Sequence, residues 1–290
     1  MLILRRAVLL LAALAVLSGR ADAQQRASFL ERWQARVDEV QSQQPHWATP
    51  VATSTPKLDQ AMRMEFVRQI NSAHSATWNL GNNKGLELIP ERHTEVIFGV
   101  PPFFLHAQPH MADGFGDFWF QAKYRFYARD EHHGNAGITA ILYATLPTGK
   151  HANGQCCAVV TPTLAAGKGF GRVALMSTLG GSLPVSNADG LGRSIVWNSV
   201  LQYRVGDTGF ARLLSPEVEI NTSFFHGGSH DGKAAVFATP GLVVGRIPLN
   251  HDAAGKPGHR ALTLAAGEHI ALTHFHTYDH GLILSMRLPF

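Results

Sequence analysis

The feature that most constrains the fold of this chain is an alternation of apolar and polar side chains, repeated in segments of about ten residues from Leu58 onward. In residues 194–206, for example, Ile195, Trp197 and Leu201 alternate with Asn198 and Gln202. Successive side chains of a strand point to opposite faces, so each such segment predicts a strand with one apolar face and one mixed face. Clusters of Gly, Pro, Asn and Asp separate the segments, as expected where strands end.

Counting these segments predicts an all-β fold, an antiparallel transmembrane β-barrel of about twelve strands over residues 58–290. The expected strands are 62–70, 76–89, 94–104, 116–128, 136–146, 158–167, 172–183, 194–206, 214–226, 235–247, 260–273 and 280–290. With an even number of strands, residues 129–135, 168–171, 207–213 and 248–259 form the periplasmic turns.

A secreted soluble β-sandwich or barrel is the structural alternative, because its strands alternate in the same way. Aromatic side chains near the ends of the apolar faces favour the membrane barrel, where they form interfacial girdles. They are Tyr124, Phe126, Tyr203, Phe224 and Phe290. Two features oppose regular strands: three prolines (Pro162, Pro216 and Pro240) lie inside them, and Glu268 falls on the lipid-facing side unless residues 265–267 hold a bulge.

The first 23 residues are typical of a secretory signal peptide. Arg5 and Arg6 precede an apolar run from Ala7 to Ser18, and Ala21-Asp22-Ala23 provides a cleavage site. The run is too short to span about 30 Å of hydrocarbon. We therefore expect a mature chain that starts at Gln24.

Residues 24–57 differ from the rest and predict a short N-terminal periplasmic helix followed by a linker. Apolar residues recur at helical spacing between Ser28 and Gln43, and Pro45, Pro50 and Pro56 follow in a Ser/Thr-rich stretch. The segment is interpreted as a periplasmic arm or, alternatively, as a plug that enters the barrel mouth.

The composition excludes several classes of protein. Apolar residues make up 45% of the chain and the net charge is only +4, which excludes intrinsic disorder. Two cysteines cannot form a disulfide framework. Basic residues are not clustered, so the sequence does not indicate nucleic-acid binding.

Leu282, Leu284, Met286, Leu288 and Phe290 share one face of the last expected strand. This pattern resembles the carboxy-terminal assembly signal of bacterial outer-membrane barrels, with Phe290 as its aromatic residue. The resemblance implies assembly into the outer membrane, with outer-membrane lipid and the barrel assembly machinery as partners.

A family resemblance rests on residues 98–150: Phe98-Gly-Val-Pro-Pro-Phe, Asp113-Gly-Phe-Gly-Asp117, Gln121-Ala-Lys-Tyr-Arg-Phe126 and Leu146-Pro-Thr-Gly-Lys150. This run is similar to the MetA-pathway of phenol degradation family of outer-membrane channels. The resemblance implies a passive channel, not an enzyme, for small hydrophobic or aromatic solutes. It carries no catalytic residues and no cofactor.

Alternation then nominates the residues that line such a channel, namely Trp119, Lys123, Arg125, Gln202, Arg204, Glu217 and Glu219. The expected inward face as a whole carries five bases, including Arg63 and Arg287, and five acids, including Glu65, Glu95 and Asp117. This balance argues against strong ion selectivity.

The alternatives are a barrel enzyme acting on lipid, of the lipase or lipid A deacylase type, and a purely structural barrel. An enzyme needs a serine and a histidine that meet on the outer wall, and His269, Ser199 and Ser285 are the nominees. The 16 histidines lack a zinc-site pattern, so we predict no metal site. Cys156-Cys157 admits a loop disulfide, free thiols or an intermolecular link.

Overall fold

The computed structural model describes residues 28–82, 84–150, 153–249 and 261–290. The expected signal peptide, residues 1–23, lies outside the described residues. The contacts divide the chain into two compact units, residues 1–35 and 36–290. The described part of the first unit is the start of helix α2 (Phe29–Ser42). The Ser28 hydroxyl accepts a hydrogen bond from the Glu31 amide, and the Glu31 carboxylate accepts one from the Ser28 amide, which forms a capping box.

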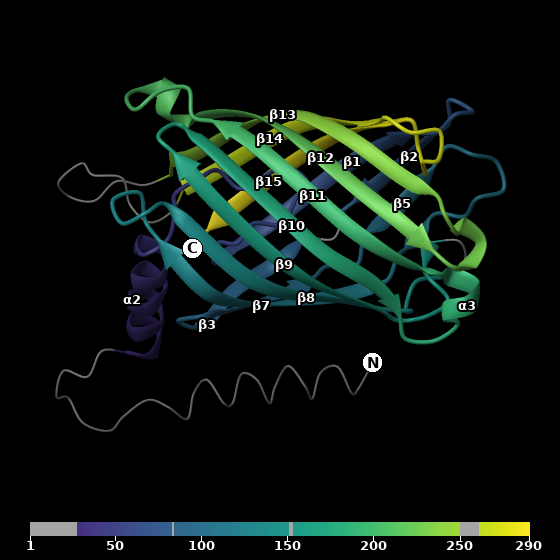
Figure 1. Ribbon diagram of the computed structural model, residues 1–290, viewed down its shortest axis with the longest axis horizontal. Coiled ribbons are helices and arrows are strands. Elements are labelled where there is room, and N and C mark those ends of the chain that lie inside the picture. Colours follow the sequence, from purple (N-terminus) through teal and green to yellow (C-terminus); the bar gives the residue numbers. More distant parts are fainter. Residues whose placement is uncertain (1–27, 83, 151–152, 250–260) are drawn as a thin grey trace, which may run out of the picture. The chain divides into compact units, whose positions relative to one another are not determined.

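The second unit is a closed antiparallel barrel of 12 strands (Figure 1). The barrel closes where β1 (Ala61–Ile70) pairs with β15 (His280–Pro289), from Ala61 opposite Pro289 to Ile70 opposite His280. The strands between them are β2 (Ala76–Leu80), β3 (Gly85–Glu91), β4 (Thr94–Gly99), β5 (Phe103–His106), β6 (Gly114–Phe115), β7 (Phe118–Arg129), β8 (Ala136–Leu146), β9 (Val159–Phe170), β10 (Val173–Pro184), β11 (Arg193–Tyr203), β12 (Leu214–His226), β13 (Ala234–Pro248) and β14 (Ala261–Ala271). Short helices α3 (Ala188–Leu191), η2 (Phe210–Leu213) and η3 (Gly228–His230) lie in the connections.

Three positions of the barrel wall are each filled by two consecutive segments. β2 and β3 both pair with β1, so they share the first of these positions. β5 pairs with β2 and β4 pairs with β3, so β4 and β5 share the second. β6 pairs with β5 and β7 pairs with β4, so β6 and β7 share the third. Pro101 and Pro102 separate β4 from β5, because proline has no amide hydrogen for the ladder. The expected strand count is thus confirmed.

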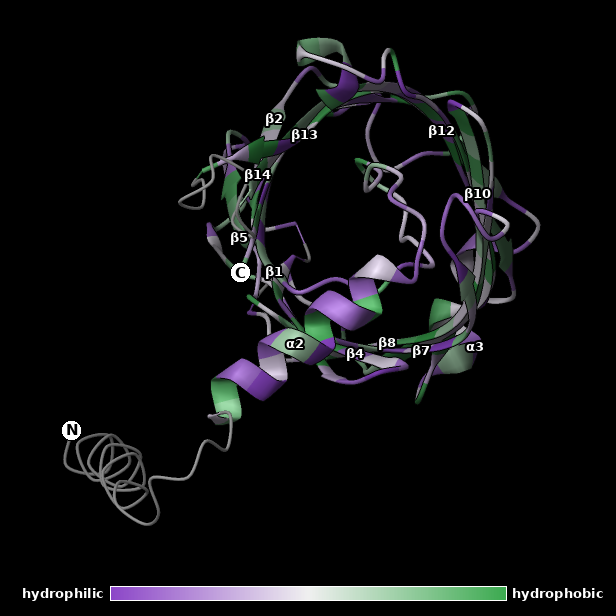
Figure 2. Ribbon diagram, turned by 90° about the vertical axis from the view of Figure 1, so that its left-hand side faces the viewer, coloured by the Kyte–Doolittle hydropathy of each residue, from purple (hydrophilic) through white to green (hydrophobic). Residues whose placement is uncertain are grey.

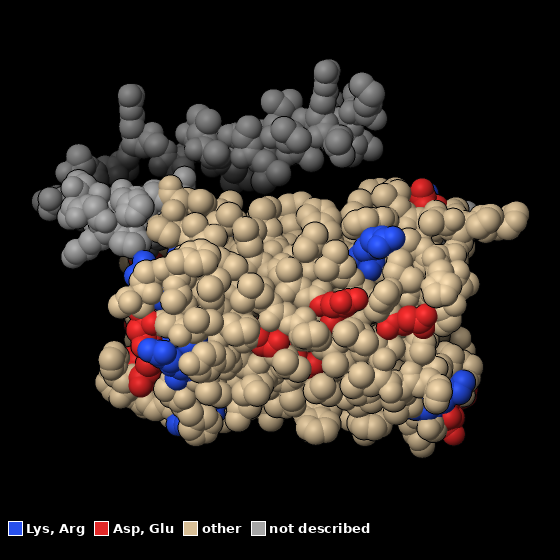
Figure 3. Space-filling model, turned by 90° about the horizontal axis from the view of Figure 1, so that it is seen from above, with Lys and Arg blue, Asp and Glu red and all other residues tan. Residues whose placement is uncertain are grey.

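Burial alternates along the strands with the polarity reversed from that of a soluble protein. In β15, Leu282, Leu284 and Met286 are exposed on the outer wall, whereas Ser285 and Arg287 are buried inside the barrel. Uncharged side chains make up most of the wall that is visible in Figure 3. This arrangement matches a barrel whose outside contacts lipid and whose inside is polar. No helix among the described residues is long and apolar enough to cross a membrane.

The irregular residues are accommodated on the outer wall. Pro162, Pro216 and Pro240 remain within β9, β12 and β13 and are exposed, and the pairing is interrupted opposite Pro162 and Pro240. No bulge occurs at residues 265–267, so Glu268 does face outward, where its carboxylate lies 3.4 Å from the His280 ring. The bulge in this region is instead in β13, between Val244 and Ile247.

Candidate functional site

The interior of the barrel is occupied by the chain that follows α2, residues 43–60, which we call the lumen segment. Figure 2 shows it running inside the ring of strands. Val51, Thr53, Thr55 and Leu58 are buried there. The chain between the helix and the barrel is therefore placed inside the lumen, as in the plug interpretation, and not beside the barrel.

Two glutamates of β12 hold the middle of the lumen segment by its backbone. Glu217 accepts a hydrogen bond of 2.7 Å from the Val51 amide. Glu219, which is fully buried, accepts bonds of 2.8 and 2.7 Å from the amides of Ala52 and Thr53. A carboxylate buried without a counter-charge is unfavourable, so these amides satisfy the glutamates as much as the glutamates hold the segment.

Basic residues of the opposite wall bind carbonyl groups of the same segment. The Arg63 guanidinium donates to the carbonyls of Pro50 and Val51 at 3.1 and 3.0 Å. Lys123 donates to the Lys57 carbonyl at 3.3 Å and lies 2.9 Å from Glu95. Side chains of the wall thus satisfy the backbone amides and carbonyls of the buried lumen segment, as a neighbouring strand does in a sheet.

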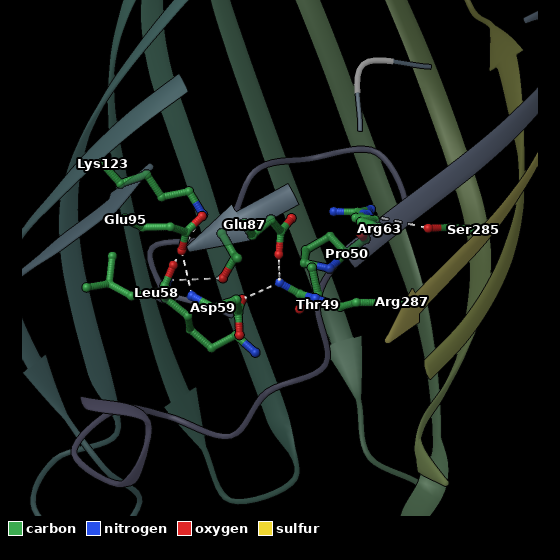
Figure 4. A network of polar contacts seen from close by, with 12 residues as sticks. Thr49, Pro50, Leu58, Asp59, Arg63, Glu87, Glu95, Lys123, Ser285 and Arg287 are labelled. Carbon is green, nitrogen blue, oxygen red and sulfur yellow. Dashed lines mark hydrogen bonds and ion pairs between the residues drawn. The ribbon is translucent and has the colours of Figure 1, made fainter. Parts of the chain in front are cut away.

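Asp59 carries the segment's own carboxylate into this network (Figure 4). It lies 2.8 Å from Arg287, which also pairs with Glu87, and its amide donates to Glu95 at 2.5 Å. Burial favours the protonated acid, but the Arg287 guanidinium and then the Lys57 ammonium outweigh it and hold the pKa of Asp59 below its usual range. The centre of the lumen is consequently a set of paired charges.

The segment also depends on small residues in the wall. A Cβ atom on Gly241 or Gly267 would lie 3.1 or 3.3 Å from the Val51 side chain, and one on Gly167 would lie 2.5 Å from the Trp47 ring. Val51 packs in a cluster with Val67, Val243 and Ile283. The sequence predicts a periplasmic turn at residues 168–171, but β9 continues to Phe170, and Gly167 and Gly169 make room for Trp47.

The seven residues nominated from alternation do not share one environment. Six of them, Trp119, Lys123, Arg125, Gln202, Glu217 and Glu219, are buried inside the barrel. Arg125 binds the Val40 carbonyl and Gln44 at 3.2 and 2.8 Å, so it holds the end of α2. Arg204 lies beyond β11, half-exposed at the barrel mouth, 3.2 Å from Asp207.

Trp119 lies flat against the wall and is only 2% exposed. Its ring stacks on Tyr143 with centroids 5.4 Å apart, and it occupies the space that a Cβ on Gly99 would fill. A solute cannot reach this ring while the surrounding side chains keep their positions. Its role in solute passage stays a prediction.

The residues nominated for catalysis do not meet. Ser199 faces outward, with its hydroxyl 3.2 Å from Ser177, while Ser285 faces inward and accepts a bond from Arg63. His269 packs inside against Phe237 and Tyr278, with ring centroids 4.4 and 5.8 Å away. Within the described residues, no group of three or more His, Cys, Asp or Glu side chains is arranged to hold a metal ion.

An open cavity of about 540 Å³ lies between the lumen segment and the end of the barrel that carries the turns after β7, β9 and β11. It is bounded by residues 44–49, by the turns after β7, β9 and β11, and by the ends of β13 and β14. His46 closes one side, because its amide and ring bind Glu131 at 2.5 and 2.8 Å. Partial burial acts to raise the pKa of Glu131, but the hydrogen bonds from His46 outweigh it and hold this pKa below its ordinary value. The cavity lies at the barrel end that the strand count assigns to the periplasm.

The fold is a closed antiparallel β-barrel, and the comparisons agree. No family model matches the sequence, and no curated protein matches it significantly. Twenty chains of known structure match the fold. One is a COG4313 outer membrane channel from Pseudomonas putida F1, of the MetA-pathway phenol degradation family, with a TM-score of 0.55 and 15% identity over 84% of this chain and 100% of that one. At this identity the likeness concerns the fold.

Proposed function

We propose that this chain is a passive channel of the outer membrane for small hydrophobic or aromatic solutes, and that the lumen segment controls its opening. The barrel carries the apolar outer wall and polar interior that insertion into lipid requires. Insertion would involve outer-membrane lipid and the barrel assembly machinery as partners. Neither a cofactor nor a nucleic acid has a place in this function.

The observation that carries the proposal is how the lumen segment is held. Its contacts with β12 include hydrogen bonds to the carboxylates of Glu217 and Glu219. Each hydrogen bond to a charged group contributes roughly 1.5–3 kcal/mol, so the loss of one or two of them shifts the equilibrium between the docked and the displaced segment by a measurable amount. A segment held this way closes the lumen and can leave it without unfolding the wall.

Conductance of the refolded full chain in planar bilayers tests the proposal. Replacing Glu219 by Ala removes two of these bonds, so we expect at least a tenfold increase in open time. The matched control is Glu268→Gln, which replaces an exposed carboxylate on the outer wall. This variant should behave as the unmodified protein. If all three proteins are closed to ions and to toluene, and the purified barrel hydrolyses phospholipid instead, the enzyme alternative replaces the channel.

A covalent link provides the opposite change. Val51 Cγ2 lies 3.1 Å from the Cβ position of Gly241, so cysteines at these positions are near enough to form a disulfide. In a background with Cys156 and Cys157 replaced by Ser, oxidation of this pair should abolish opening and dithiothreitol should restore it. Unchanged conductance after complete oxidation would show that solutes pass without displacing the segment.

A further inference from the structure

The cavity between the lumen segment and the turns has an excess of basic side chains, whereas the charges at the centre of the lumen are paired. Among the residues that the structure describes, its lining holds six basic side chains and three acidic ones. Four arginines of this lining come from the connections after β9 and β11 and from β13, and we call the space they surround the basic vestibule: Arg172, Arg204, Arg212 and Arg246. A concave site with an excess of one sign of charge concentrates ligands of the other sign.

Arg246 reaches the vestibule because of the bulge in β13. Along β13, even-numbered residues such as Leu242 face outward, and strict alternation would place Arg246 in lipid. The register instead shifts between Val244 and Ile247, and Arg246 adopts a left-handed φ of 55°. One additional residue in a strand exchanges the two faces, so the guanidinium turns toward the lumen. A left-handed conformation at a residue other than glycine is unfavourable and is typical of functional sites.

The arginines of the vestibule differ in their partners. Arg172 and Arg204 share the carboxylate of Asp207 at 2.5 and 3.2 Å. The guanidinium groups of Arg246 and Arg212 form no hydrogen bond or ion pair with the described part of the chain. Trp47 contributes its indole ring to the same lining. Two guanidinium groups that have no partner in the described ranges are a suitable pair of donors for a carboxylate.

We propose that the basic vestibule is a binding site for a small organic anion, a monocarboxylate with a flat apolar body, held by Arg246 and Arg212. The inference rests on the proposed channel function, since it names the class of solute that leaves through this mouth. The carboxylate binds the guanidinium groups, and the flat body lies against Trp47. An inorganic anion would use only the first of these contacts.

Titration calorimetry of the full chain in detergent tests this site, with sodium benzoate as probe and benzamide as its uncharged isostere. We expect benzoate to bind at least tenfold more tightly than benzamide, and more weakly as salt rises. The double variant Arg246→Gln/Arg212→Gln should lose at least tenfold in benzoate affinity. Arg193→Gln, an exposed arginine at the start of β11, should change nothing.

A second variant tests the same site by a gain of affinity, so the result does not depend on whether the double variant folds correctly. Asp207→Asn releases Arg172 and Arg204 from their shared carboxylate, so benzoate should bind severalfold more tightly. Equal binding of benzoate and benzamide, or an unchanged affinity in both the double variant and Asp207→Asn, would overturn the site. Benzoate binding without bilayer conductance would refute the channel and leave the site standing, whereas conductance without selective binding would refute only the site.

Discussion

At the scale of single residues, the side of the wall on which a position lies decides which residue types it tolerates. Ile220 and Asn221 are neighbours in β12, but Ile220 is 37% exposed on the outer wall, whereas Asn221 faces inward and binds Thr53 at 3.0 Å. Ile220→Arg places a charge near the bilayer midplane and should cost about 2–4 kcal/mol in urea unfolding. Asn221→Arg should leave the barrel nearly as stable and increase its conductance, because it removes a bond to the lumen segment. Equal loss of unfolding free energy in both variants would mean that the facing is wrong.

At the scale of elements, the lumen segment carries a basic group into the barrel. Burial, only partly offset by Asp59, lowers the pKa of Lys57 to about 8, whereas an unfolded lysine has a pKa near 10.5. Between these two values the undocked segment binds more protons than the docked one, so docking becomes more favourable as the pH rises through about 8, up to a limit of roughly 3 kcal/mol. Channel opening in bilayers should therefore decrease from pH 7 to pH 9.5.

The control for this pH dependence is Lys57→Met, which keeps the length of the side chain and removes its charge. This variant should open as rarely at pH 7 as the unmodified protein does at pH 9.5. A pH profile that the substitution leaves unaltered would assign the dependence to other groups.

At the scale of the whole molecule, the barrel depends on one junction between distant parts of the sequence. Leu284 in β15 lies opposite Phe66 of β1 and Ala266 of β14, so its backbone belongs to the strand that closes the wall. Leu284→Pro removes an amide hydrogen at this junction and should prevent closure, with loss of the heat-sensitive fast-migrating form on electrophoresis. Leu284→Ala keeps the amide and should retain that form. An intact barrel in the proline variant would indicate that closure does not need this ladder.

The sequence by itself determined the barrel, the number of its strands and the facing of most wall residues. The reason is local: a strand repeats every two residues, so Leu282 and Arg287 are assigned to opposite faces without knowledge of any partner. Alternation likewise assigned Lys123, Glu217 and Glu219 to the interior, but it could not say what they bind. Their partners are backbone groups of residues 51–57, far away along the chain.

Only the tertiary structure decided where the lumen segment lies and which arginines form the vestibule. Residues 43–60 have no strand or helix period, and their place depends on contacts with Glu217, Arg63 and the glycines of β13 and β14. Arg246 would be assigned to lipid by alternation, because a single-residue bulge leaves no mark in the pattern of apolar residues. Such features arise from contacts between strands and the segment they enclose, and a period read along one strand carries no information about them.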